Sequence, residues 1–243
     1  MAVRFHSTSV TLVLLLCVLG SQALELLRVT STSGDAPSTA AVKCWCPSYP
    51  NLTVCSWPEP SQSAPMHYIA TYSERSQQAN STSCSLIKAD SPSSESEQLW
   101  RCHLPNMKLL TDYIVNVTAV SSGKSSSHLT SFMLEDIVKP DPPVDVRVFP
   151  HSIRNLSVEW SPPPTWASLD IFPLKYQIVY KWENRGNPHS VKVGPFESTR
   201  AKLKGLLPGR AYQFQVCAKE LLDLGHCSDW SAPVKVTIPK TKP

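Results

Sequence analysis

Alternating hydrophobic and polar residues run through the second half of the chain. In residues 155–160, Leu156, Val158 and Trp160 share one face of an extended strand, while the polar residues between them share the other. Residues 211–220 alternate in the same way. Further short strand patterns occupy residues 175–182, 189–194, 199–206 and 233–238. About seven strands at intervals of roughly 8–15 residues, with no long amphipathic helix pattern, predict an all-β sandwich.

The first half follows the same plan more weakly. Residues 112–120 place Tyr113, Val115 and Val117 on one face and Asn116 on the other. Between the halves, residues 138–148 carry three prolines within four positions, which exclude a helix and stiffen the chain. The pattern therefore predicts two related β-sandwiches in tandem, with domains at 24–138 and 139–243 joined by a short rigid connection.

One local pattern in the second half is more specific than alternation. Leu206 and Pro208 precede Tyr212, which opens the alternating strand at 211–220. This spacing is typical of a tyrosine corner, in which the ring packs in the core and its hydroxyl binds the backbone of the preceding loop. The alternative is an ordinary core tyrosine after a loop, and the spacing favours the corner.

The N-terminus predicts a signal peptide over residues 1–23. A positive charge at Arg4 is followed by an apolar run at 10–19 and a small-residue cleavage pattern at 21–23. The alternative, a membrane anchor, needs about 20 apolar residues, and this run is half that long. The sequence contains no second apolar run and no hydrophobic tail. We therefore expect a secreted, extracellular protein without membrane insertion.

Composition narrows the function classes. Hydrophobic residues make up 42% of the chain, and prolines (22) outnumber glycines (8), which suits short strands and turns better than glycine-rich nucleotide loops. Without the signal peptide the charge is 22 basic minus 19 acidic residues, or +3, and it is scattered. Nucleic-acid binding, which needs a dense basic stripe, is not expected. The sequence has no catalytic signature motif, its seven histidines are dispersed, and we expect no enzyme, cofactor or metal site.

Four Asn-x-Ser/Thr motifs support an extracellular destination, because each is a potential glycosylation site. They begin at Asn51, Asn80, Asn116 and Asn155. Asn116 and Asn155 fall on the polar faces of their predicted strands, where a glycan has room.

Seven cysteines remain after the signal peptide, five of them in the first half. In an oxidising compartment they are expected to form disulfides. A zinc site is a weak alternative, because no Cys-x-x-Cys pair is present and Cys44-Trp45-Cys46 is too tight for a standard finger. The count is odd, so one cysteine must be unpaired within the monomer.

Several of these motifs together resemble the cytokine-binding module of the class I cytokine receptors. The motifs are Cys44-x10-Cys55-x-Trp57, the later cysteine pair, the proline-rich joint and the sequence Ser228-Asp229-Trp230-Ser231. The resemblance covers essentially the whole predicted mature chain. It implies two tandem fibronectin type III-like β-sandwich domains that meet at an elbow, whose loops bind a four-helix cytokine.

The resemblance also implies a disulfide pattern. Cys44 would pair with Cys55, Cys84 with Cys102, and Cys46 would be left over, either as a partly buried free thiol or in a bond to another chain. We lean towards no intermolecular bond, because the sequence identifies no partner cysteine.

In the family a Trp-Ser-x-Trp-Ser box stacks its tryptophans between arginines of the neighbouring strand. Here Cys227 stands at the first tryptophan, and Cys217 stands where an arginine is usual. We therefore expect a Cys217–Cys227 bridge in place of one stacking contact, worth about 2–3 kcal/mol. The alternative is two free thiols. The box residues Ser228, Asp229, Trp230 and Ser231 are expected to be structural.

By the same resemblance, three loops form the partner surface: 107–112, 166–172 and 220–225. Leu109 and Leu110 are adjacent apolar residues, so at least one should be exposed. The predicted partner-binding residues are Leu109, Leu110, Asp170, Phe172, Leu222, Asp223 and Leu224. The alternative is that the leucines only cap the ends of the sandwiches.

The resemblance implies a secreted subunit of a heterodimeric cytokine, which binds a four-helix-bundle cytokine subunit and engages signalling class I cytokine receptors of the shared type. A soluble receptor of the alpha type, or a decoy that binds a finished cytokine reversibly, is the alternative. An extracellular enzyme is the competitor from a different class, and the sequence offers no machinery for it.

Overall fold

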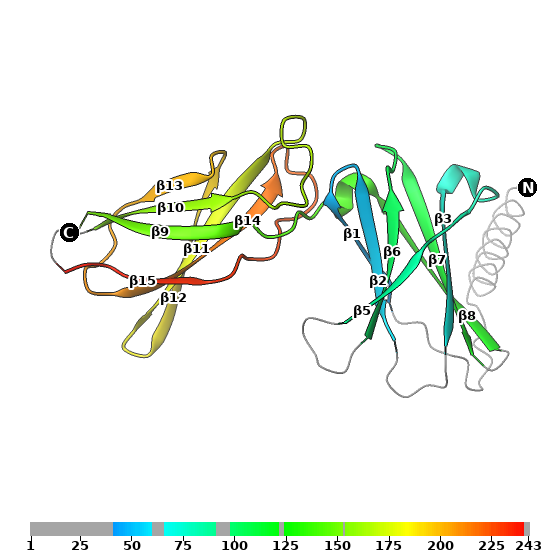
Figure 1. Cartoon of the computed structure of the whole chain (residues 1–243), viewed down its shortest axis with the longest axis horizontal. Coiled ribbons are helices and arrows are strands. Elements are labelled where there is room, and N and C mark those ends of the chain that lie inside the picture. The colour runs from blue at the N-terminus through cyan, green and yellow to red at the C-terminus, as the bar shows by residue number, and fades with distance from the viewer. Residues whose placement is uncertain (1–40, 60–65, 91–97, 122–123, 153, 241–243) are drawn as a thin grey trace, which may run out of the picture. The chain divides into compact units, whose positions relative to one another are not determined.

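The computed structural model describes residues 41–59, 66–90, 98–121, 124–152 and 154–240 (Figure 1). The predicted signal peptide lies outside the described residues. No helix in the described part of the chain is long and apolar enough to cross a membrane. The described residues belong to one compact unit.

Antiparallel strands of the first domain build two sheets, with strand orders β1-β2-β6-β5 and β4-β3-β7-β8. Figure 1 shows them as the two layers of a sandwich. A short 3-10 helix, η2 (Leu134–Ile137), ends the domain, and another, η1 (Arg75–Gln77), follows β3. The strands are β1 (Lys43–Ser48), β2 (Leu52–Pro58), β3 (His67–Glu74), β4 (Thr82–Ser83), β5 (Leu86–Asp90), β6 (Gln98–Pro105), β7 (Asp112–Ser121) and β8 (Lys124–Met133).

The second domain is also a two-layer sandwich, with strand orders β13-β10-β9 and β12-β11-β14-β15 (Figure 1). Its strands are β9 (Val144–Ser152), β10 (Asn155–Ser161), β11 (Leu174–Asn184), β12 (Asn187–Phe196), β13 (Arg200–Leu203), β14 (Ala211–Glu220) and β15 (Val234–Thr237). The all-β class and the tandem sandwich architecture predicted from the sequence are confirmed.

Alternation along the strands explains the cores. In β7, Val115 and Val117 are fully buried, while Ile114, Asn116 and Thr118 face outwards. The same alternation buries the apolar residues of β10 and β14 in the second domain. Burial of one such aliphatic side chain stabilises the fold by about 1.5–3 kcal/mol, so a one-residue slip in register would be strongly disfavoured.

Aromatic clusters fill both sandwiches. In the first domain Tyr68 lies between Trp57 and Trp100, with ring centroids 5.8 and 5.5 Å away. In the second, Trp160 packs edge-on against Tyr176 at 5.3 Å. Tilted and edge-on contacts at these distances add to the energy of area burial.

Both domains contain a tyrosine corner. Tyr212 accepts a hydrogen bond from the backbone N–H of Leu207 at 3.1 Å, the geometry that the sequence predicts. Tyr113 accepts one from the N–H of Lys108 at 2.8 Å. The second contact was not foreseen, because the first domain has no proline at the corresponding position, and it fixes the start of the loop that precedes β7.

Three disulfides join Cys44 to Cys55, Cys84 to Cys102 and Cys217 to Cys227. Cys46 is free and completely buried, and burial raises the pKa of its thiol to about 12. The thiol therefore stays protonated and unreactive at neutral pH. Cys46 is buried more deeply than the sequence suggested. Its burial favours a free thiol over a disulfide to another chain.

Candidate partner-binding surface

The loop at 107–111 holds an exposed leucine in an unusual backbone conformation. Met107 is buried, and the Tyr113 hydroxyl fixes the N–H of Lys108. Beyond this anchor Leu109 is 43% exposed and Leu110 is 82% exposed. Leu110 has φ of +53°, in the left-handed region that a leucine adopts at a cost of about 1–2 kcal/mol. The fold thus holds an apolar side chain in solvent despite both penalties.

Glu135, in η2, holds this conformation in place. Its Oε1 accepts the backbone N–H of Leu110 at 2.9 Å and the hydroxyl of Tyr49 at 3.3 Å. Burial first, and then the nearby Glu135 carboxylate, raise the pKa of Tyr49 to about 12. Tyr49 therefore remains a neutral hydroxyl donor at any physiological pH, which is what the carboxylate requires.

Tyr49 also contacts the second loop. Its ring packs edge-on against Phe172, with centroids 4.8 Å apart. Ser48 and Asn51 add two weaker polar contacts, from Ala167 N–H to Ser48 Oγ at 3.4 Å and from Asn51 Nδ2 to Ser168 Oγ at 3.5 Å. The backbone of Leu110 is therefore linked through Glu135 and Tyr49 to Phe172.

The second loop, residues 162–173, is organised around a buried tryptophan. Trp166 donates its ring N–H to the carbonyl of Phe172 at 2.8 Å, and the N–H of Phe172 donates to Ser168 at 2.8 Å. These bonds turn the backbone so that Ile171 is 73% exposed and Asp170 is exposed. Phe172 is only partly exposed and packs on the core. The aliphatic side chain offered to solvent here is Ile171, next to the residue that the sequence suggested.

The third loop follows β14, which ends at a buried carboxylate. Glu220 is 1% exposed, and its Oε2 accepts the N–H of Leu224 at 3.2 Å. The loop then presents Leu222, which is 79% exposed, while Leu224 is half-buried against the core. Asp223 adopts φ of +72°, so this loop, like the first, holds a non-glycine residue in the left-handed region.

The charge at Asp223 is paired within the chain. Its carboxylate forms ion pairs with Lys175 at 2.7 Å and Lys219 at 3.1 Å. Hydrogen bonds from Lys175 and then Lys219 lower the pKa of Asp223. This corner of the surface therefore carries more lysine than carboxylate.

The chain between the domains joins these loops. Val138 pairs with Cys46 in a parallel bridge, and the N–H of Lys139 donates to the Cys46 carbonyl at 3.0 Å. From the other side the N–H of His226 donates to the Val138 carbonyl at 2.7 Å. Gly225 has φ of +53°, and a Cβ there would overlap the backbone of Val138. Only glycine permits this approach.

The segment Ser228–Ser231 pairs with β14 through its serines. Ser228 donates its N–H to the Ala218 carbonyl at 2.7 Å, and its hydroxyl accepts the Ala218 N–H at 2.9 Å. Ser231 repeats both contacts with Val216, at 2.9 and 3.0 Å. The hydroxyls thus take the place of strand carbonyls as acceptors for β14, which gives the two serines a structural role.

The neighbours of this segment hold it further. Asp229 forms an ion pair with Lys139 at 2.9 Å. The ammonium of Lys192, on β12, lies 5.7 Å from the ring centroid of Trp230, within reach of a cation–π contact. The Cys217–Cys227 disulfide lies next to Ser228. Cys217 is 1% exposed, although the alternation of β14 places it on the polar face, because the bridge covers it.

The structure thus assigns different surroundings to the seven predicted residues. Leu109, Leu110, Asp170, Leu222 and Asp223 are exposed, whereas Phe172 and Leu224 pack partly on the core. Sequence reasoning missed Ile171, although it lies between the two predicted residues Asp170 and Phe172. It also missed Tyr49 and Glu135, whose roles depend on contacts between segments far apart in the chain. No group of side chains suited to a metal ion occurs within the described ranges.

Comparisons with known proteins agree with this architecture. Residues 40–132 match the family described as "IL27B N-terminal FN3 domain", and residues 141–237 match the fibronectin type III domain. Human interleukin-27 subunit beta is 38% identical over 202 residues, covering 81% of this chain and 84% of that one. The mouse subunit is 38% identical over 220 residues, covering 88% and 92%.

Receptor alpha chains match more weakly. Human interleukin-11 receptor subunit alpha is 28% identical over 88% of this chain and 52% of its own length. The chicken ciliary neurotrophic factor receptor subunit alpha is 31% identical over 84% of this chain and 54% of its own. The chain is therefore a cytokine-binding, receptor-like subunit and not an enzyme, and it belongs to the interleukin-27 subunit beta family.

Proposed function

We propose that the protein is secreted as the receptor-like subunit of a heterodimeric cytokine. It binds a four-helix-bundle cytokine subunit through its three loops at 107–112, 166–172 and 220–225 and presents that subunit to signalling class I cytokine receptors of the shared type. The similarity to interleukin-27 subunit beta over most of both chains supports this assignment.

The observation that carries the proposed binding mode is the state of Leu110. An aliphatic side chain that is 82% exposed, on a left-handed backbone fixed by Glu135, is disfavoured in the free protein. Such strain persists where the surrounding structure imposes it, and it concentrates at binding sites. Leu222 and Ile171 offer comparable exposed aliphatic groups on the other two loops. An apolar helix face of a partner would cover these side chains.

The test is co-secretion from animal cells. The tagged chain is expressed alone and together with each of a panel of four-helix cytokine subunits, and the tagged protein is recovered from the medium. We expect stable co-purification with at least one helical subunit. The double variant Leu110→Ser/Leu222→Ser should reduce the recovered partner at least tenfold, while its own secretion stays unchanged.

A matched control is available on the same domain. Ile87, in β5, is 44% exposed and lies outside the three loops, so Ile87→Ser should leave co-purification unchanged. Equal loss of the partner with this control would mean that general apolar surface, and not the loops, drives association. Recovery of no helical subunit would contradict the proposal.

The similarity to receptor alpha chains favours one alternative, a soluble receptor that binds a finished cytokine reversibly. In that case the chain would be secreted well folded on its own and would capture an assembled cytokine from the medium. Adding purified cytokines to the conditioned medium separates the two functions.

A further inference from the structure

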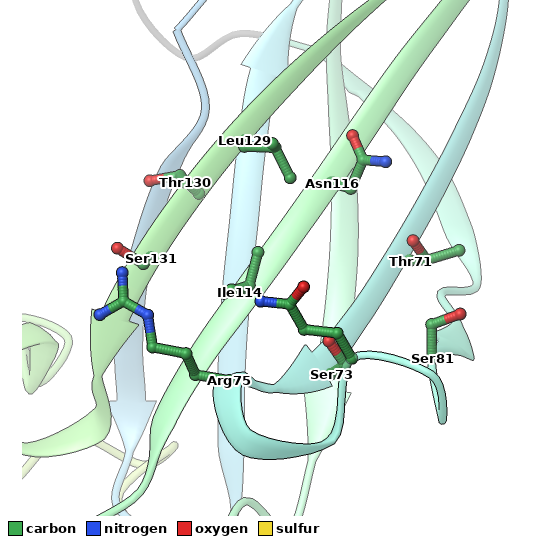
Figure 2. Close-up of a pocket in the computed structure, with 10 residues that line it drawn as sticks. Thr71, Ser73, Arg75, Ser81, Ile114, Asn116, Leu129, Thr130 and Ser131 are labelled. Carbon is green, nitrogen blue, oxygen red and sulfur yellow. The ribbon is translucent and has the colours of Figure 1, made fainter. Parts of the chain in front are cut away.

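The outer face of the sheet β4-β3-β7-β8 is apolar at two positions where a solvated sheet would be polar. Strand pairing places Thr71, Asn116 and Leu129 in one row across β3, β7 and β8. Figure 2 shows these three side chains on the same side of the sheet. In the neighbouring row Ile69 pairs with Thr118. Leu129 is 67% exposed and Ile69 is 56% exposed, so exposed aliphatic side chains lie in the Asn116 row and in the row beside it.

A hollow lies beside this row. It encloses about 420 Å³ and is lined by Thr71, Ser73, Arg75, Gln78, Ser81, Ile114, Asn116, Leu129, Thr130 and Ser131 (Figure 2). The amide oxygen of Asn116 is buried and makes no hydrogen bond within the described part of the chain. An unpaired buried amide oxygen costs about 1–3 kcal/mol. The hollow also leaves the apolar side chains of Ile114 and Leu129 without a cover.

The sequence supplies a covalent occupant at this position. Asn116 opens the motif Asn-Val-Thr, and its side chain lines the hollow itself. Asn51 and Asn80, by contrast, lie exposed in turns, and the Asn51 amide already contacts Ser168. A sugar has apolar C–H faces that can cover aliphatic side chains, and it has hydroxyl groups that can bond to the polar side chains lining the hollow.

We propose that an N-glycan on Asn116 fills this hollow and covers Leu129 and Ile69, so that it acts as part of the fold of the first domain. In the modification, Asn116 Nδ2 bonds to C1 of the first sugar of a lipid-linked oligosaccharide diphosphate. The bond from C1 to the diphosphate oxygen breaks, the lipid diphosphate leaves, and Nδ2 loses one proton. The step needs the secretion included in the proposed function, but it does not depend on partner binding.

The first experiment compares glycan-free variants of the full secreted chain. Glycopeptide mass spectrometry should find Asn116 occupied in the wild type. Asn116→Gln should raise the fluorescence of an environment-sensitive apolar dye at least twofold and lower the monomer fraction in size-exclusion chromatography. Asn80→Gln, which removes a glycan site from an exposed turn, should change neither. Thr118→Ser keeps the motif and should behave as the wild type.

Two further substitutions test whether the glycan acts by covering the aliphatic side chains or in some other way. Adding Leu129→Thr and Ile69→Thr to Asn116→Gln should return dye fluorescence and monomer fraction to wild-type values. If the Asn116→Gln variant is not secreted, glycan trimming on the folded wild type replaces it. An endoglycosidase that leaves one sugar should keep dye fluorescence low, and an amidase that removes the whole glycan should raise it.

An unoccupied Asn116 in the secreted protein would overturn the proposal. So would unchanged dye fluorescence after complete removal, or failure of the threonine variants to reverse the change. Partner co-purification is measured on the same samples. Failure of the wild type to recover any helical subunit speaks against the proposed function and leaves this inference standing.

Discussion

Replacement of Leu110 by glycine should separate binding from stability. The substitution removes a side chain that is 82% exposed, and it places glycine where φ is +53°. Relief of the left-handed conformation contributes about 1–2 kcal/mol to stability. The greater freedom of glycine in the unfolded chain opposes it by about 0.4–1 kcal/mol. We therefore expect the free energy of unfolding to be unchanged or to rise by about 1 kcal/mol.

Binding should respond in the opposite direction. Burial of a leucine side chain contributes about 1.5–3 kcal/mol, and each 1.4 kcal/mol is about tenfold in affinity. Loss of the Leu110 side chain should thus lower the affinity for the helical partner by about 10- to 100-fold. Leu110→Ala should weaken it similarly, but without the gain in stability, because alanine retains the left-handed penalty.

The measurements are biolayer interferometry with the co-secreted partner and denaturant unfolding of the isolated chain. Ile87→Gly is the control, because it replaces an exposed aliphatic residue within β5. There glycine should cost about 0.5–1 kcal/mol of stability and leave the Kd unchanged. A Kd within threefold of wild type for Leu110→Gly would refute the anchor role. A stability loss above about 1 kcal/mol for Leu110→Gly would refute the claim that the backbone of Leu110 is strained.

Three further outcomes follow from the structure. Replacing Cys217 and Cys227 together by serine should lower the free energy of unfolding by about 3 kcal/mol, as expected for an intact loop of this length; no change in denaturant midpoint would contradict a stabilising role. Gly225→Ala should reduce secretion severely, because its Cβ would overlap the backbone of Val138; quantitative blotting of the medium decides this. The folded-state pKa of Tyr49, about 12, lies above the ordinary tyrosine value of 10.0, so the unfolded chain loses this proton first. Stability should fall as pH rises from about 10 to 12, and Tyr49→Phe should reduce that slope in alkaline unfolding titrations.

The sequence predicted the sandwiches because their information is local. The alternation around Val158 and Val117 fixes which face of each strand is buried, and the spacing before Tyr212 specifies the corner. The three disulfides of the structure join the pairs that the family resemblance implied. In each case the information lies either within about ten neighbouring residues or in a motif shared with the family.

The binding loops were harder to read, because their geometry depends on distant contacts. Glu135 reads as an ordinary acidic residue before the proline joint, yet it holds the backbone of Leu110 and the hydroxyl of Tyr49. The pairing of Asp223 is likewise hidden from the sequence, because Lys175 reaches it from a strand nearly fifty positions earlier. Which of two adjacent apolar residues faces solvent, as with Ile171 and Phe172, depends on the turn around Trp166.

The serines at 228 and 231 have a consequence for the behaviour of the protein at high concentration. Their hydroxyls satisfy the β14 amides of Ala218 and Val216, so the segment covers this side of the sheet without forming a strand itself. A regular strand here would present a ladder of unpaired amides on its far side, a template for addition of another chain. The irregular segment offers no such ladder. It thereby protects the sheet border from strand-by-strand aggregation during synthesis and transport, before any partner is bound.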